Sequence, residues 1–196
     1  MPASFTDNEM IEIRARLKSH ARTCLLRYGV KKTSIDQLVE EAGISKGAFY
    51  KFYDSKELLF FEIFEDIQNE ISVSAVNALK ENADLPAYER IRKVILASLF
   101  AFDELGGAAV WNDEIDYVMR KLPEERLKGH FHLDETQIEE IILNNGFKVS
   151  RSSREISAII RAMFLLLSHK KEIGEDLFDS VATFFTDAIS AELMRV

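Results

Sequence analysis

Helical patterning runs through nearly the whole chain, and this pattern limits the protein to an all-α fold. Only three prolines occur in 196 residues, and runs of alternating β-branched residues, which predict strands, do not occur. Apolar residues instead recur every three to four positions, which is the spacing of one helix face. We expect helices near residues 6–28, 34–43, 46–52, 55–80, 86–104, 108–122, 124–145, 152–170 and 175–194.

Capping motifs support the first two of these helices. Thr6 with Glu9, and Ser34 with Gln37, have the spacing of a capping box, in which both side chains bond backbone N–H groups. Gly29 follows the first helix, where a residue able to adopt a left-handed conformation is expected. The apolar stripe of that helix consists of Ile13, Leu17, Ala21, Cys24, Leu25 and Tyr28. It includes the only cysteine, so an internal disulfide is excluded and we interpret the thiol as part of the core.

Residues 33–59, TSIDQLVEEAGISKGAFYKFYDSKELL, predict two short helices joined by a tight glycine turn, with a third helix directly after them. This order is typical of a helix-turn-helix that reads DNA. At 100° per residue, the second helix divides into two faces. One face carries Lys46, Gly47, Tyr50 and Lys51. The opposite face carries Ala48, Phe49 and Phe52, which can pack on the preceding helix.

The first of these faces has side chains that suit a DNA duplex. Lysines neutralise phosphates or reach guanine acceptors, a tyrosine hydroxyl bonds a phosphate, and a glycine permits close approach of the backbone. Hydroxyl groups at helix starts, and a lysine that opens the next helix, add phosphate contacts. These further candidates are Thr33, Ser34, Ser45 and Lys56. The alternative, a surface helix pair without DNA contact, explains each feature singly but not their occurrence in this order.

The formal net charge of −8 does not argue against DNA binding, because the charge is unevenly distributed. Residues 14–56 contain ten Lys or Arg and four Asp or Glu, a formal +6. Residues 61–196 contain fifteen and twenty-five, a formal −10. Phosphate binding depends on the local charge of the contacting face, and an acidic remainder discourages indiscriminate contact. The basic region coincides with the helix-turn-helix.

The segment YGVKKTSIDQLVEEAGISKGAFYKFYDSKELL resembles the DNA-binding segment of the TetR family of bacterial transcriptional regulators. The matching elements are YG before the second helix, TS-I at its start, AGISKGAFY through the turn, and SKELL after it. They cover about residues 8–60. One departure is Phe52-Tyr53, where family members more often carry His or Tyr followed by Phe. The resemblance implies DNA contacts by Thr33, Ser45, Lys46, Gly47, Ala48, Tyr50, Lys51 and Lys56.

The resemblance also implies two domains. Residues 1–55 would bind DNA, with the helix-turn-helix at about 33–52, and residues 56–196 would form a larger helical domain that binds an effector and dimerises. The residues support a homodimer independently, because Arg161 is the only charged residue within 156–167 and a helix that is apolar all round needs burial on more than one side. Internal core packing is the alternative. The expected interface contains Ile160, Met163, Phe164, Leu167, Val181, Phe184, Phe185 and Ala188.

Aromatic residues between positions 98 and 131 suggest a small-molecule pocket, because such sites combine apolar walls with a few polar groups. Core packing is the alternative for each of them. The candidates are Phe100, Phe102, Trp111, Tyr117, Met119 and Phe131, and they favour an apolar or aromatic effector.

We expect no metal at His130, His132, Asp134 and Glu135, since residues two apart on a helix point in different directions. A solvated helix start capped by Asp134 explains them.

We therefore expect a dimeric, ligand-responsive transcriptional regulator, with repression preferred to activation. It would bind a palindromic operator in double-stranded DNA and be released by a small-molecule effector, a mechanism that follows from the resemblance. A helical adaptor without specific DNA binding is the alternative, and it leaves the outward face without a role.

We expect neither an enzyme nor a cofactor, because no Walker loop, GxSxG, HExxH or dinucleotide fingerprint occurs. Without a secretion signal or an apolar run of membrane length, we expect a cytoplasmic location and no membrane partner.

Overall fold

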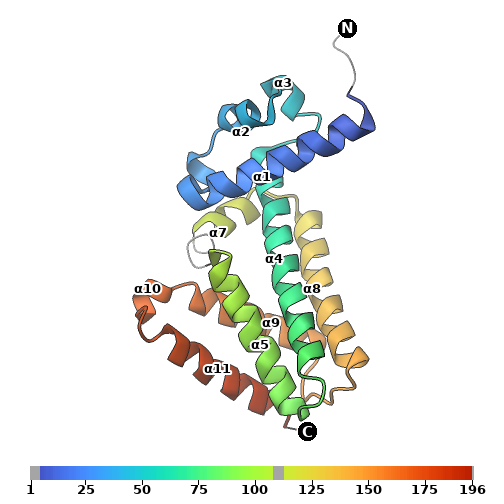
Figure 1. Cartoon of the computed structure of the whole chain (residues 1–196), viewed down its shortest axis with the longest axis vertical. Coiled ribbons are helices and arrows are strands. Elements are labelled where there is room, and N and C mark those ends of the chain that lie inside the picture. The colour runs from blue at the N-terminus through green and yellow to red at the C-terminus, as the bar shows by residue number, and fades with distance from the viewer. Residues whose placement is uncertain (1–4, 108–112, 196) are drawn as a thin grey trace. The chain divides into compact units, whose positions relative to one another are not determined.

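The computed structural model describes residues 5–107 and 113–195, and all regular structure within these ranges is helical (Figure 1). The helices are α1 (Asp7–Lys32), α2 (Ile35–Ala42), α3 (Lys46–Phe49), α4 (Lys56–Glu81), α5 (Ala87–Glu104), α7 (Asp113–Met119), α8 (Glu124–Asn144), α9 (Ser153–Leu167), α10 (Lys170–Ile173) and α11 (Phe178–Leu193). The all-α prediction is confirmed. The helix predicted over 108–122 is described only from residue 113, as α7.

Residue contacts divide the chain into two compact units. The first unit consists of Met1–Asp66 with Asp113–Leu122, and the second unit consists of Ile67–Asn112 with Pro123–Val196. The division therefore falls within α4, and α7 belongs to the first unit although it lies far along the chain. The functional boundary predicted after residue 55 stays a prediction.

The first helix is interrupted at Gly29. This residue has a φ of 74° and a ψ of 171°, which are not helical values, although helical hydrogen bonding resumes up to Lys32. A positive φ favours glycine, because a Cβ atom would be strained in this conformation. The predicted apolar stripe of α1 is buried except for Tyr28, whose side chain is exposed. Val30, which follows the break, is fully buried.

The second helix of the helix-turn-helix is shorter than its predicted range of 46–52. Helical structure ends at Phe49, and the N–H groups of Lys51 and Phe52 donate to carbonyl oxygens three residues earlier, at 3.0 and 2.9 Å. Such bonds tighten a helix into a 3₁₀-like turn. Tyr50 and Lys51 therefore lie on a turn that continues α3.

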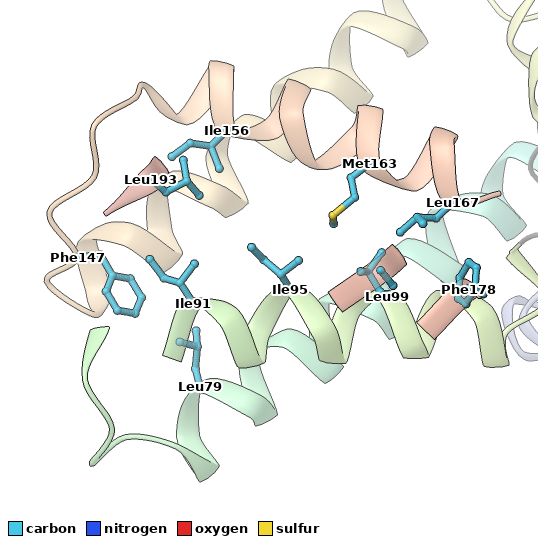
Figure 2. Packing of buried hydrophobic residues seen from close by; sticks show 11 residues of the cluster. Leu79, Ile91, Ile95, Leu99, Phe147, Ile156, Met163, Leu167, Phe178 and Leu193 are labelled. Carbon is cyan, nitrogen blue, oxygen red and sulfur yellow. The ribbon is translucent and has the colours of Figure 1, made fainter. Parts of the chain in front are cut away.

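The core of the second unit lies between α5, α9 and α11. Figure 2 shows Met163 and Leu167 of α9 directed toward Ile95 and Leu99 of α5. Phe178, at the start of α11, packs in the same cluster. The start of α9 carries a complete capping box, in which Ser152 accepts the Glu155 N–H and the Glu155 carboxylate accepts the Ser152 N–H.

Candidate nucleic-acid interface

Hydroxyl groups fix the starts of both helices of the helix-turn-helix. The Ser34 Oγ accepts the Gln37 N–H at 3.2 Å, and the Gln37 side chain accepts the Ser34 N–H at 2.8 Å. The Ser45 Oγ accepts the Ala48 N–H at 3.2 Å, which caps α3. Both serines remain exposed at the surface. Between the helices, Gly43 adopts the left-handed conformation with a φ of 69°, as a helix end requires.

The two predicted faces of α3 and its following turn separate in the structure. Phe49 is fully buried and Phe52 is 7% exposed, whereas Tyr50 is 51% exposed. The remaining members of the outward face, Lys46, Gly47 and Lys51, are also exposed. Ala48 is half-buried, so it belongs fully to neither face. We call Lys46, Gly47, Tyr50 and Lys51 the reading face.

Tyr53 anchors the end of this motif inside the first unit. Its hydroxyl donates to the Glu62 carboxylate at 2.5 Å, and the Arg14 guanidinium lies over its ring at 5.2 Å from the centroid. Burial, together with the bond to Glu62, raises the pKa of Tyr53. The neutral phenol therefore remains a hydrogen-bond donor that ties the turn after α3 to α1 and α4.

A shallow depression of about 400 Å³ brings together four of the predicted DNA contacts. It is lined by Ser34, Ile35, Asp36, Lys46, Tyr50, Asp54, Ser55, Lys56 and Glu57. Three of these side chains are acidic and two are basic, so the formal charge of the lining is −1. The depression has the polar groups and the tyrosine that a DNA backbone contact uses, but not the positive charge expected from the sequence.

Both lysines of the reading face have partners within the first unit. The Lys46 ammonium lies 3.0 Å from the Asp36 carboxylate, and both side chains are exposed. The Lys51 ammonium lies 5.4 Å from the centre of the Phe5 ring, a cation–π distance. Exposed contacts of these two kinds contribute only about 1 kcal/mol or less each, so a DNA phosphate can replace them.

Lys56 has a structural role that the sequence did not indicate. Its ammonium donates to the carbonyl oxygens of Val30 at 2.8 Å and of Thr33 at 2.6 Å, and so caps the end of α1. Thr33 is 1% exposed, and its hydroxyl donates to the Gly29 carbonyl at 2.7 Å. Both side chains therefore form hydrogen bonds with the backbone of the connection between α1 and α2. The DNA contacts predicted for Lys56 and Thr33 stay predictions.

The same connection is held from its other side by Glu114 of α7. One carboxylate oxygen accepts the N–H groups of Val30 at 2.7 Å and of Lys31 at 3.2 Å. A Cβ atom at Gly29 would lie 2.4 Å from this carboxylate. A carboxylate that accepts N–H groups directly after a helix break stabilises the backbone there, because it satisfies donors that the break leaves free.

Tyr117 extends the contact of α7 within the first unit. Its hydroxyl donates to Glu57 at 2.9 Å, and this bond raises the pKa of Tyr117. The Lys31 ammonium lies 5.7 Å from the centre of its ring. Sequence reasoning did not single out Glu114, and it assigned Tyr117 to the effector pocket and not to this contact. Their only signal is the apolar spacing of Ile115, Val118 and Leu122, which predicts a buried face but not the partner it packs against.

The six predicted effector-pocket residues are not all found in one unit. Trp111 lies outside the described residues, and Tyr117 and Met119 belong to the first unit. In the second unit, Phe102 is buried and its ring lies 5.0 Å from that of Phe164, so it packs in the core. Phe100 is 42% exposed, and Phe131 is half-buried beneath the Arg161 guanidinium at 4.5 Å. The pocket stays a prediction.

Asp134 does not cap a helix start, as the sequence suggested, because it lies in the middle of α8. Its carboxylate accepts from Arg161 of α9 at 3.0 Å and from the Gln68 amide of α4. The expectation was wrong because α8 begins at Glu124, directly after Pro123 and ten residues before Asp134. Asp134 joins three helices of the second unit.

The predicted dimer residues on α9 and α11 differ in burial. Met163 and Leu167 are buried in the core of the second unit, which leaves them almost no surface for a partner (Figure 2). Phe184 is 68% exposed and Ala188 is exposed, while the other four are half-buried. Three further large apolar side chains are exposed on or directly before these helices: Leu165, Leu166 and Leu177.

Residues 19–63 match the family model described as bacterial regulatory proteins, tetR family. Residues 19–63 therefore form a domain of the kind that defines this family, and the similarity is to transcriptional regulators and not to enzymes. Among the helices of the described ranges, none is long and apolar enough to cross a membrane.

Two curated relatives and one solved structure show how far the similarity extends. The transcriptional repressor AcnR of Corynebacterium jeikeium (strain K411) is 28% identical over 146 residues, which cover 66% of this chain and 74% of that protein. The regulator YhgD of Bacillus subtilis (strain 168) is 30% identical over 93 residues, 47% of this chain, and the match spans only 45% of its own length. A TetR-family regulator from Syntrophomonas wolfei shares the fold, with a TM-score of 0.65, 19% identity and coverage of 95% and 98% of the two chains.

Proposed function

We propose that this protein is a transcriptional repressor that binds a palindromic operator as a homodimer and is released by a small-molecule effector. The observation that carries the proposal is the reading face, four exposed residues set opposite the buried Phe49 and Phe52. The match of residues 19–63 to the TetR family supports DNA as the partner, and the similarity to the repressor AcnR supports repression as the outcome.

The dimer is supported by the exposed apolar surface on α9 and α11. Leu177, Phe184 and Ala188 are spaced along one face of α11, and Leu165 and Leu166 are exposed on α9. A self-complementary patch of this kind suits a two-fold interface. A two-fold protein presents two reading faces to half-sites about 34–36 Å apart, or a multiple of that distance.

We expect the effector to bind the second unit, beside aromatic side chains. Phe131 and Phe100 of the second unit have surface available, and Arg161 lies over the Phe131 ring. A site lined by these rings and this guanidinium would suit an apolar or aromatic molecule that carries a polar substituent. A thermal-shift screen of small aromatic compounds tests this part, because a molecule that binds the folded state raises the melting temperature.

A mobility-shift experiment tests DNA binding itself. The probe is the DNA upstream of the protein's own gene, and the variant carries Lys46→Ala with Tyr50→Ala. We expect the wild type to form a complex that weakens steeply as salt rises, and the double variant to lose the specific complex. A folded double variant that retains the complex would contradict the assignment of the reading face, and a wild type that binds no DNA would favour an adaptor.

A further inference from the structure

Asp36 lines the depression, carries a negative charge and is not among the predicted DNA contacts. Asp36 lies in the first turn of α2, and its carboxylate is 3.0 Å from the Lys46 ammonium of the reading face. Both side chains are well exposed, at 70% and 54%. The pair therefore lies at the surface where a DNA backbone would approach.

The charges around this pair make the surface poorly suited to arbitrary DNA. The depression holds three carboxylates and two ammonium groups. Of the two ammonium groups, Lys56 is bonded to backbone carbonyls and Lys46 is paired with Asp36. No cation in the lining is therefore available to a phosphate without first giving up a partner.

We propose that Asp36 is a specificity-determining residue, which weakens binding to non-cognate DNA by holding the Lys46 ammonium and repelling phosphate. The inference rests on the proposed function and names how discrimination arises at the same site. Non-cognate binding is almost entirely electrostatic, so it is sensitive to the loss of one cation. A cognate site also gains from base-edge contacts of the reading face, which compensate for the exchange of Asp36 for DNA.

Discrimination by a repulsive group is a general device, because specificity is a difference between two affinities. The exposed ion pair itself is weak, so DNA can open it. Its removal should leave Lys46 free for one further phosphate contact. One additional displaced counterion multiplies affinity by up to about eightfold at about 0.1 M salt, from a dependence of log K on log salt of about −0.9 per contact.

The test measures the affinity of the full-length protein for a duplex of random sequence by fluorescence anisotropy, over a range of KCl concentrations. The variant is Asp36→Asn, which removes the charge and keeps the size. Glu40→Gln, on an exposed residue of the same helix that does not line the depression, is the matched control for the change in net charge. Circular dichroism confirms that the variants keep the helical content of the wild type.

We expect Asp36→Asn to bind random DNA several-fold more tightly than either the wild type or Glu40→Gln, with a salt slope steeper by about 0.9. The gain should disappear when Lys46→Met is added. Unchanged or weaker binding of random DNA by Asp36→Asn would overturn the inference, and so would a gain that persists with Lys46→Met. If the wild type and every variant bind no DNA even at low salt, the proposed function itself fails, which is a different result.

Discussion

One residue of α7 and one of α4 hold the connection between α1 and α2. Glu114 accepts two backbone N–H groups from residues 84 and 83 positions earlier, on one side of this connection. Lys56 donates to two carbonyl groups on the other side. The connection contains Gly29, with its positive φ, and leads directly to the Ser34 cap of α2. The start of α2 therefore depends on charged groups from two other segments of the first unit.

Glu114→Ala should destabilise the protein by roughly 1–3 kcal/mol, because it leaves two N–H groups without their charged acceptor. Urea unfolding followed by circular dichroism measures this loss.

Gly29→Ala should also be destabilising, since its φ is positive and its Cβ would meet the carboxylate at 2.4 Å.

The double variant separates these two causes. In a Glu114→Ala background the steric contact is gone, so Gly29→Ala should cost less than it does in the wild type, but still roughly 1–3 kcal/mol for its backbone conformation. Equal costs in both backgrounds would show that the carboxylate does not lie against Gly29.

At the level of helices, the sequence predicts where a helix begins better than it predicts which other helix it packs against. The capping boxes at Thr6 and Ser34 were recognised from a spacing of three residues, and both are formed. Their signal is local, so one short stretch of sequence contains it. The placement of α7 in the first unit depends on contacts with residues about 84 positions away, and no local pattern encodes that choice.

The exposure of the reading face was predictable because its signal also lies in one short stretch of sequence. The partners of Lys46 and Lys56 were not predictable in this way. The alternation of exposed Tyr50 with buried Phe49 and Phe52 follows from helical geometry alone. The pairing of Lys46 with Asp36 joins two helices across a turn, and the capping of α1 by Lys56 joins positions 26 apart. A count of charges along the chain therefore overestimated the positive charge available to DNA.

The capping box of α9 gives a pH-dependent prediction. Backbone and side-chain hydrogen bonds from Ser152 lower the pKa of Glu155 below 4.5. Because the folded pKa is depressed, the stabilisation is present at neutral pH and is lost as pH falls through that folded pKa.

The thermal stability of Glu155→Ala should therefore be lower than that of the wild type at pH 7. The difference should narrow as the pH falls below the usual pKa of a glutamate and then through the lower folded pKa, below which the carboxylate is protonated in both states. Melting curves recorded between pH 7 and 3.5 measure this. A difference that stays constant over the range would show that the charge of Glu155 does not act through the cap.

At the scale of the whole molecule, recognition of an inverted repeat requires that two copies associate, and we expect them to do so through α9 and α11. Phe184 is 68% exposed on α11 and would be buried in such a dimer. Phe184→Glu should convert the dimer to a folded monomer, because a buried unpaired carboxylate is costly.

Sedimentation equilibrium compares this variant with Val73→Glu, which places the same charge at a 59% exposed apolar site on α4, outside the proposed interface. Val73→Glu should remain dimeric. Dissociation by both variants, or by neither, would not fit an interface on α9 and α11.

Selection from a pool of randomised duplexes shows whether the reading faces of a two-fold dimer recognise a DNA sequence. After several rounds of binding and sequencing, the wild type should enrich an inverted repeat with half-sites about 10 base pairs, or a multiple of that, between centres. The folded variant with Lys46→Ala and Tyr50→Ala should enrich none. A folded, dimeric wild type that enriches no sequence, or one that enriches the same repeat as the double variant, would contradict the account.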